Sequence, residues 1–242
     1  MIMPYGLMTF GRVKTDPSKK FILDFEFQYE GSGNGSARSF ELGPGLSVRP
    51  LNSLKLGIRA DYSGNHDELQ YVATRDLGAF GFGKRYILGT IGQKTIGLTF
   101  RVDLNITPEF SVQYYGSPFL SRGSYSELKR VIDPEADRYE DRFALYENPI
   151  FTDGLYILSD DDEGMRVDYL ISNPDFNFHQ FRSNLVAKWE YRLGSFIYLV
   201  WSSDRTGRND LSEASIGESY RQLRDVFPKN IFLVKLNYWF TL

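Results

Sequence analysis

The sequence predicts an all-β protein, an antiparallel up-and-down transmembrane β-barrel of about 8–10 strands with long loops. Apolar and polar residues alternate along many stretches, the apolar sides of the six clearest stretches carry no charge, and several stretches are nine to eleven residues long. Alternation at period two places the two sets of side chains on opposite faces of a strand. A tilted strand of about 9–11 residues crosses a bilayer.

The first half of the chain contains most of the predicted strands. Alternation predicts strands at 21–29, 40–48, 54–62 and 96–106, with a weaker strand at 85–91. Within the second of these, Gly43-Pro44-Gly45 indicates a bulge or bend. A turn at Thr107-Pro108-Glu109 leads into a strand at 110–114, which completes a hairpin.

Residues 116–177 show no sustained period and are expected to form a long-loop insertion with one or two short strands. Strands are predicted again at 181–191, 195–202 and 230–242. The one plausible helix is 210–226, which begins with the capping-box-like pair Asp210 and Glu213.

Three groups of candidate functional residues follow from the two faces of these strands. The residues expected to face lipid are Phe21, Leu23, Phe25, Phe27, Leu98, Phe100, Val102, Leu104, Phe232, Val234 and Leu236. The charged residues expected to face the lumen are Asp24, Glu26, Glu41, Arg59, Asp61, Arg101, Asp103, Lys188, Glu190, Arg192 and Lys235. The residues expected in an aromatic girdle or an assembly signal are Tyr29, Tyr62, Tyr114, Trp189, Tyr191, Tyr238, Phe240 and Leu242.

Acidic and basic residues nearly balance on the polar faces of these strands. A charge-selective pore carries an excess of one sign along its wall. The balance therefore favours ion pairs across the interior and a filled or narrow lumen.

Composition excludes several classes of protein. The 242 residues include no cysteine, so neither a disulfide scaffold nor a thiolate zinc site can form. The net charge of −3 argues against a nucleic-acid partner. Neither His66 nor His179 has metal-ligand spacing, and we expect no metal, cofactor or catalytic residue. The acidic run at 160–163 lacks the spacing of a calcium loop and is expected to be a solvated loop.

A signal peptide has a basic segment ahead of an apolar run and then a cleavage site of small residues, and the start of the chain shows neither feature. We expect residues 1–242 to form a single barrel unit that is the C-terminal part of a longer protein.

The end of the chain resembles that of a known family. The alternate large residues Tyr238, Phe240 and Leu242 resemble the terminal assembly signal of Gram-negative outer-membrane barrels. The runs FRSNLVAKWEYRLGSFIYLVWS at 181–202 and NIFLVKLNYWF at 230–240 are similar to a Bacteroidota outer-membrane family, domain of unknown function 5916. The pieces at 16–20, 43–50 and 70–72 are compatible with it. The resemblance implies a C-terminal barrel preceded by a carbohydrate-binding-module-like sandwich, and it supplies no catalytic residues.

The leading hypothesis is therefore a non-enzymatic barrel in the cell outer membrane, acting as an anchor or narrow conduit, with saccharide binding or uptake supplied by an N-terminal domain. Its partners would be the lipid bilayer, the barrel-assembly machinery, and a saccharide or an outer-membrane protein. Two alternatives stay open. One is a soluble lipocalin-like barrel whose apolar face lines a ligand cavity. The other is a carbohydrate-active enzyme that uses interior carboxylates.

Overall fold

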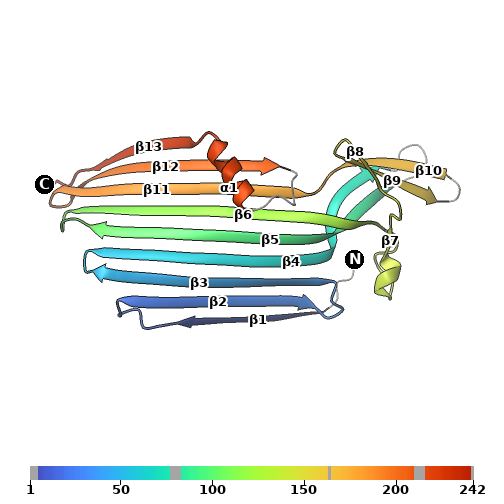
Figure 1. Ribbon diagram of the computed structural model, residues 1–242, viewed down its shortest axis with the longest axis horizontal. Helices are drawn as coiled ribbons and strands as arrows, with labels where there is room; N and C mark the ends of the chain where they lie inside the picture. Colours follow the sequence, from blue (N-terminus) through green and yellow to red (C-terminus); the bar gives the residue numbers. More distant parts are fainter. Residues whose placement is uncertain (1–4, 77–82, 163–164, 210–215, 241–242) are drawn as a thin grey trace.

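A computed structural model describes residues 5–76, 83–162, 165–209 and 216–240, and most of them belong to one long antiparallel sheet (Figure 1). Its strands lie in the order β1-β2-β3-β4-β5-β6-β11-β12-β13, and a short strand β7 also pairs with β6. Their bounds are β1 Gly6–Lys14, β2 Phe21–Ser32, β3 Ala37–Leu51, β4 Leu54–Asp76, β5 Lys84–Asn105, β6 Phe110–Val131, β7 Phe143–Leu145, β11 Phe176–Arg192, β12 Ser195–Asn209 and β13 Lys229–Asn237.

The long sheet is a meander in which neighbours along the chain are neighbours in the sheet, apart from the step from β6 to β11. Short connections at 15–20, 52–53, 106–109 and 193–194 join strands at the end of the sheet where the C-terminus lies (Figure 1). The longer segment 132–175 leaves from the opposite end, where β4 and β12 also end. We call these the short-turn end and the long-loop end. Within the described residues, β1 and β13 are the two unpaired edges.

The register keeps apolar side chains on one face, because directly paired residues point to the same side of a sheet. A single row of paired residues crosses the sheet from β2 to β13. It consists of Phe21, Val48, Leu56, Val102, Tyr114, Leu185, Trp201 and Phe232. We call this side the apolar face and the other side the polar face.

A second, three-stranded sheet lies at the long-loop end and contains β8 (Ile150–Thr152), β9 (Leu155–Asp162) and β10 (Met165–Ser172). It packs on the far ends of β5 and β6 around the buried residues Ile87, Leu128, Tyr146, Leu158, Tyr169 and Ile171. A 3-10 helix at Tyr139–Arg142 precedes β7. The main buried hydrophobic cluster of the described residues is therefore here, beyond the end of the long apolar face.

The one α-helix, α1 (Ile216–Asp225), lies over the apolar face of β11 and β12. It is anchored by a buried hydrogen bond from Asn177 Nδ2 to Ser219 Oγ, 2.9 Å long. The predicted helix at 210–226 is confirmed in its second half. Its capping-box residues Asp210 and Glu213 lie outside the described residues.

The predicted all-β antiparallel class is confirmed, but several details of the prediction are wrong. The strand β1 was missed, and the weak strand at 85–91 is continuous with the next one in β5. The chain passes Gly43-Pro44-Gly45 without a bulge, and the register of β3 shifts only between Val48 and Leu51. The segment 116–177 is more ordered than expected, because β6 extends to Val131 and four further strands follow.

Candidate functional site

The two faces of the long sheet differ in chemistry and in exposure. On β2 the apolar side chains are more exposed than the acidic side chain between them, which is the reverse of the usual arrangement in a water-soluble domain. On β2, the apolar residues Phe21, Leu23 and Phe25 are 65%, 58% and 42% exposed. The Asp24 side chain between them on the other face is only 15% exposed. Soluble sheets pack their apolar face on a core and leave the polar face in water.

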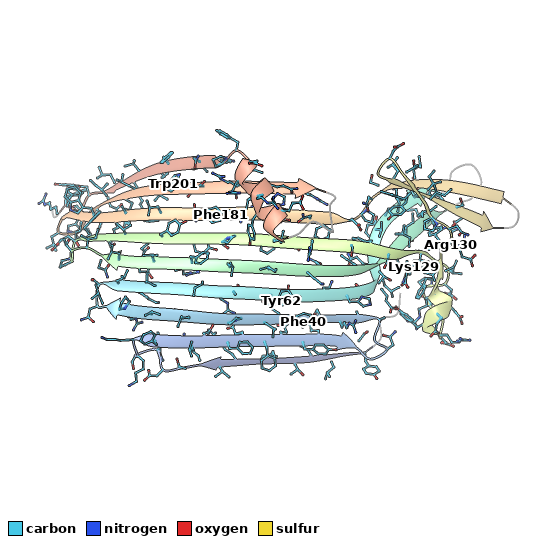
Figure 2. All side chains as sticks on the ribbon, viewed as in Figure 1. Phe40, Tyr62, Lys129, Arg130, Phe181 and Trp201 are labelled. Carbon is cyan, nitrogen blue, oxygen red and sulfur yellow. The ribbon has the colours of Figure 1, made fainter. Side chains whose placement is uncertain are left out.

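The structure brings the residues expected to face lipid together on the apolar face. Cross-strand pairs join Phe100 to Ile58, Val102 to Leu56, and Leu236 to Ile197. Most of the sheet's apolar face has no covering layer within the described residues, and α1 covers only a part near β11 and β12. Figure 2 shows Phe40, Tyr62, Phe181 and Trp201 spread along this sheet, far from the compact long-loop end marked by Lys129 and Arg130.

The polar face carries a network of ion pairs centred on Arg59 of β4. Its guanidinium contacts Asp24 Oδ1 at 2.6 Å, Glu26 Oε2 at 2.5 Å and Asp61 Oδ1 at 2.8 Å. Arg12 of β1 adds contacts of 2.9 Å to both Asp24 and Glu26. Two cations and three carboxylates from β1, β2 and β4 thus form one network, which passes over β3. Sequence reasoning missed Arg12, because β1 mixes Met8 and Phe10 into its polar side and blurs the alternation.

Glycine in β3 makes the Arg59 network possible. Arg59 reaches over β3 to the carboxylates of β2, and a Cβ at Gly43 would overlap the Arg59 guanidinium. At Gly45, the same added atom would lie 3.6 Å from Asp24 Oδ1. The Gly43-Pro44-Gly45 segment therefore leaves space on the polar face, and the bulge that was one of its two predicted roles is absent from the register.

A second polar cluster lies on β11 and β12. The Arg182 Nε atom contacts Asp204 Oδ2 at 2.9 Å, and Gln180 Nε2 donates to Thr206 Oγ1 at 2.7 Å. Asp204 was not among the predicted residues, because its pairing with Arg182 follows only from the register of β11 and β12. Three other predicted bases contact aromatic rings on the same face: Arg101 over Tyr115, Lys188 over Phe196, and Lys235 over Tyr198.

The ion pairs of the polar face lie along one sheet, and ion pairs across a barrel interior stay a prediction. Within the Arg59 network, Arg12 and Arg59 contact carboxylates of β2, and Arg59 also contacts Asp61 of its own strand. The network does not include the predicted residues Glu41 and Asp103, which lie on the polar face near it. Acidic and basic side chains of the polar face therefore find partners along the sheet itself.

Two predicted lumen residues lie at the short-turn end. Glu190 Oε1 accepts a hydrogen bond of 2.8 Å from the Gly194 amide and so closes the turn. A register shift after Glu190 moves Arg192 out of the polar row, and Arg192 donates to the Tyr238 hydroxyl at 2.7 Å. Arg192 thus groups with the aromatic residues rather than with Lys188.

Most of the residues expected in a girdle lie near the ends of apolar rows. Trp189 and Tyr191 contact each other at the short-turn end, as do Tyr238 and Phe240. Tyr29 and Tyr62 lie toward the long-loop end and both adjoin Phe40. Tyr114 does not end its row, which continues through Pro118 and Leu120. Leu242 lies outside the described residues.

Buried charges gather at the long-loop end, in a segment for which the sequence predicts long loops with one or two short strands. Asp160 of β9, 3% exposed, contacts Arg85 at 2.7 Å and Arg130 at 2.8 Å. The expectation that residues 160–163 form a solvated loop is therefore wrong for Asp160. Burial and the charge of Asp160 raise the pKa of the Tyr146 hydroxyl above its usual range. The alternation of apolar and polar residues is blurred in β9 and β10, because Asp160 lies on their buried face with Leu158 while Leu170 lies on their exposed face.

Lys129 is a second buried charge in this region. Its Nζ donates to Thr90 Oγ1 at 3.1 Å, lies 3.8 Å from Glu127 Oε2 and stands over the Phe143 ring at 4.9 Å. Burial lowers the pKa of the Lys129 amine, although the nearby acids oppose the shift. Among the described residues, no three His, Asp or Glu side chains converge as a metal-ligand set.

None of the helices in the described ranges is long and apolar enough to span a membrane. The fold and its faces define an all-β protein with a long antiparallel sheet, apolar on one side and ion-paired on the other. The model of the family described as domain of unknown function (DUF5916) matches residues 1–241, and the chain belongs to this family. Comparison with curated proteins finds no match.

Proposed function

We propose that this chain forms the wall of a β-barrel in a bacterial outer membrane, where it acts as a membrane anchor or a narrow conduit. The observation that carries the proposal is the exposure of the apolar face. Large side chains such as Phe232, Val234 and Leu199 are 76%, 70% and 53% exposed on one continuous face. Soluble monomers rarely expose an apolar surface of this extent, and contact with lipid would bury it.

The strand geometry supports the same proposal. Lipid offers no hydrogen-bonding partner, so a sheet in a membrane must have both edges paired. β1 and β13 would therefore pair with each other or with further strands. The apolar part of β2 spans nine residues, Phe21 to Tyr29, which is close to the length that a tilted strand needs. Long-loop and short-turn ends would then lie on opposite sides of the membrane, as in bacterial barrels.

The polar face is proposed to line the interior. The Arg59 network, with two arginines and three carboxylates, and the Arg182–Asp204 pair bring nearly equal numbers of both signs to the wall, so the interior would show little selectivity for ions of one sign. An anchor needs no more than such a neutral wall. A conduit for saccharide would use the exposed polar groups and the rings of Tyr115, Phe196 and Tyr198. The terminal strand, with Tyr238 and Phe240, is the proposed contact with the barrel-assembly machinery.

The soluble lipocalin-like alternative is disfavoured by the same exposures. Such a barrel places its apolar side chains in the interior, where curvature crowds them. Here the side chains of the polar face are the more enclosed set. For the enzyme alternative, the polar-face carboxylates Asp24, Glu26 and Asp61 form ion pairs with arginine, and the described residues of this face set no two carboxylates apart for acid–base chemistry.

Fractionation of cells tests this proposal. The protein, expressed with its native flanking sequence, is expected in the outer-membrane fraction, to resist carbonate washing and to need detergent to stay monodisperse. A known peripheral protein that carbonate releases serves as the control. Recovery in the carbonate supernatant, with a monodisperse species in the absence of detergent, would overturn the proposal.

A further inference from the structure

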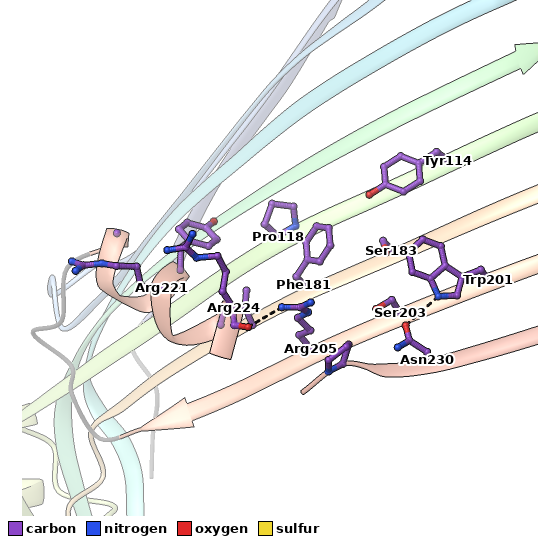
Figure 3. A pocket seen from close by; sticks show the side chains of 14 residues that line it. Tyr114, Pro118, Phe181, Ser183, Trp201, Ser203, Arg205, Arg221, Arg224 and Asn230 are labelled. Carbon is purple, nitrogen blue, oxygen red and sulfur yellow. Dashed lines mark hydrogen bonds between the residues drawn. The ribbon is translucent and has the colours of Figure 1, made fainter. Parts of the chain in front are cut away.

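A groove on the apolar face combines an aromatic floor with a basic rim. It has a volume of about 650 Å³, within the range of small-molecule sites, and lies between α1 and strands β6, β11, β12 and β13 (Figure 3). Tyr114, Pro118, Phe181 and Trp201 form its floor. Since these four residues come from three neighbouring strands, the sheet itself fixes the shape of the floor.

Three arginines line the groove on the side of the helix. Arg221 and Arg224 project from α1, and Arg205 projects from β12 below it (Figure 3). Arg205 Nη1 donates to the Arg224 backbone oxygen at 3.0 Å, which joins the strand to the end of the helix. Among the described residues, none of the three contacts a carboxylate within ion-pair distance. The Arg59 guanidinium, by contrast, has three carboxylate partners.

The groove lies where the apolar face gives way to polar residues. On β12 the outward row reads Leu199, Trp201, Ser203 and Arg205 toward the long-loop end. Trp201 Nε1 donates to Asn230 Oδ1 at 3.1 Å at this boundary. Indole side chains favour the level of lipid headgroups, with the ring in the apolar layer and the N–H toward polar groups. The arginines therefore lie on the headgroup side of the floor.

We propose that this groove binds one anionic phospholipid, with an acyl chain on the floor and the phosphate held by the arginines. The guanidinium group forms paired hydrogen bonds to phosphate, and both its charge and its planar geometry suit that group. An apolar ligand without charge would offer the three arginines no anionic partner. This inference rests on the proposed function, because the membrane both supplies the lipid and sets the level of the groove.

Fluorescence of Trp201 tests the proposal directly. The chain has three tryptophans, so the double variant Trp189→Phe/Trp239→Phe leaves Trp201 as the only one. This variant is inserted into phosphatidylcholine vesicles that contain a minor fraction of phosphatidylglycerol with brominated acyl chains, which quench indole on contact. Matched vesicles carry the bromine on the same fraction of phosphatidylcholine instead. The expected result is an apparent enrichment of the anionic lipid at Trp201 of about tenfold over the zwitterionic one.

Charge variants separate the groove from general attraction of anionic lipid. We expect the enrichment to be abolished in the triple variant Arg205→Gln/Arg221→Gln/Arg224→Gln. The double variant Arg221→Gln/Arg224→Gln retains the Arg205 side chain and its bond to the helix. We expect this double variant to reduce the enrichment severalfold. The control Lys14→Gln/Lys19→Gln/Lys20→Gln removes the same charge at the short-turn end and should leave the enrichment unchanged. Equal quenching by both lipids, or equal loss in the control, would overturn the proposal.

A second arm keeps this test separate from the proposed function. Short-chain phosphatidylglycerol, below its micelle concentration, is titrated against the same single-tryptophan protein in neutral detergent. Saturable quenching or shift of Trp201 emission, lost in the triple arginine variant, supports the groove even where carbonate washing releases the protein. If the protein remains in membranes but neither lipid nor short-chain analogue distinguishes the arginine variants, the groove proposal fails and the barrel proposal stands. Equal binding of a brominated fatty acid would also overturn the preference for phosphate.

Discussion

Arg59 on β4 reaches over β3 and lies 2.5 Å from Glu26 Oε2 on β2, so that one guanidinium ties together strands that share no backbone hydrogen bond. The same group also contacts Asp24 and Asp61. This relationship makes the polar face of the sheet a connected layer. It also makes Arg59 the residue on which the stability of that layer depends most.

Replacing Arg59 with alanine is expected to lower the free energy of unfolding by about 1–3 kcal/mol, because three partly enclosed carboxylates lose a shared partner. The measurement is urea-induced unfolding from detergent micelles or vesicles. The control Arg182→Ala, whose side chain is 63% exposed and has one carboxylate partner, should cost less than about 1 kcal/mol. Equal losses in the two variants would contradict the assigned role of Arg59.

Alanine at Gly43 is expected to destabilise the sheet by displacing the Arg59 guanidinium, which occupies the position of the added Cβ. The cost should shrink when Arg59 is already alanine, and a double-mutant cycle measures that coupling. Gly57→Ala is the matched control, since its added Cβ would lie 3.6 Å from Ser47 Oγ in ordinary contact. Additive effects of Gly43→Ala and Arg59→Ala would show that the glycine acts in some other way.

The polar network shows what sequence patterns can and cannot predict. Alternation in β2 correctly assigned Asp24 and Glu26 to one face, because the period of a strand fixes the side on which each residue lies. Their partners Arg12 and Arg59 lie one and two strands away, and such pairing depends on register. The register of β2, β3 and β4 could not be predicted from the sequence alone. The groove at α1 was missed for the same reason, because Phe181, Trp201 and Arg224 meet only through tertiary packing.

Replacing Asp160 with asparagine is expected to unfold the small sheet locally, since two guanidinium groups lose the buried carboxylate between them. Loss of one partner of a buried ion pair costs about 3–5 kcal/mol. Hydrogen exchange should accelerate across β8, β9 and β10 while the amides of β2 to β5 nearest the short-turn end keep their protection. The control Asp153→Asn lies at a turn with φ of 50°, a conformation that asparagine tolerates. Uniform loss of protection in both sheets would contradict this separation.

Because Lys129 is buried, we expect the free energy of unfolding to rise with pH. Its folded-state pKa is lowered from the ordinary value of 10.5, so the folded protein releases this proton at lower pH than the unfolded chain does. The unfolded state then binds more protons between the two pKa values, and the free energy of unfolding increases as pH rises through that interval. The increase should be absent in Lys129→Met and unchanged in the exposed control Lys14→Gln. Identical pH profiles for wild type and Lys129→Met would refute the assignment.

The strands at the long-loop end could not be predicted from the period of apolar residues. Residues of β9 such as Leu158 and Asp160 are buried although they lie in a stretch that the sequence describes as charged and irregular. The buried face of the small sheet carries Asp160 beside Leu158, and its exposed face carries Leu170, so apolar and polar residues do not sort cleanly between the two faces. The long sheet was predictable because each of its faces has one chemistry along many residues.

The central claim is that the apolar face contacts lipid, and a pair of neighbouring residues tests it most directly. Phe100 and Thr99 are adjacent on β5 and lie on opposite faces, Phe100 paired with Ile58 and Thr99 with Arg59. Aspartate at Phe100 is expected to block membrane insertion, because a charge on the lipid side of a barrel costs a few kcal/mol. Aspartate at Thr99 would lie beside Arg59 and should insert as the wild type does. If carbonate washing releases neither variant, or releases both alike, the assignment of the two faces is contradicted.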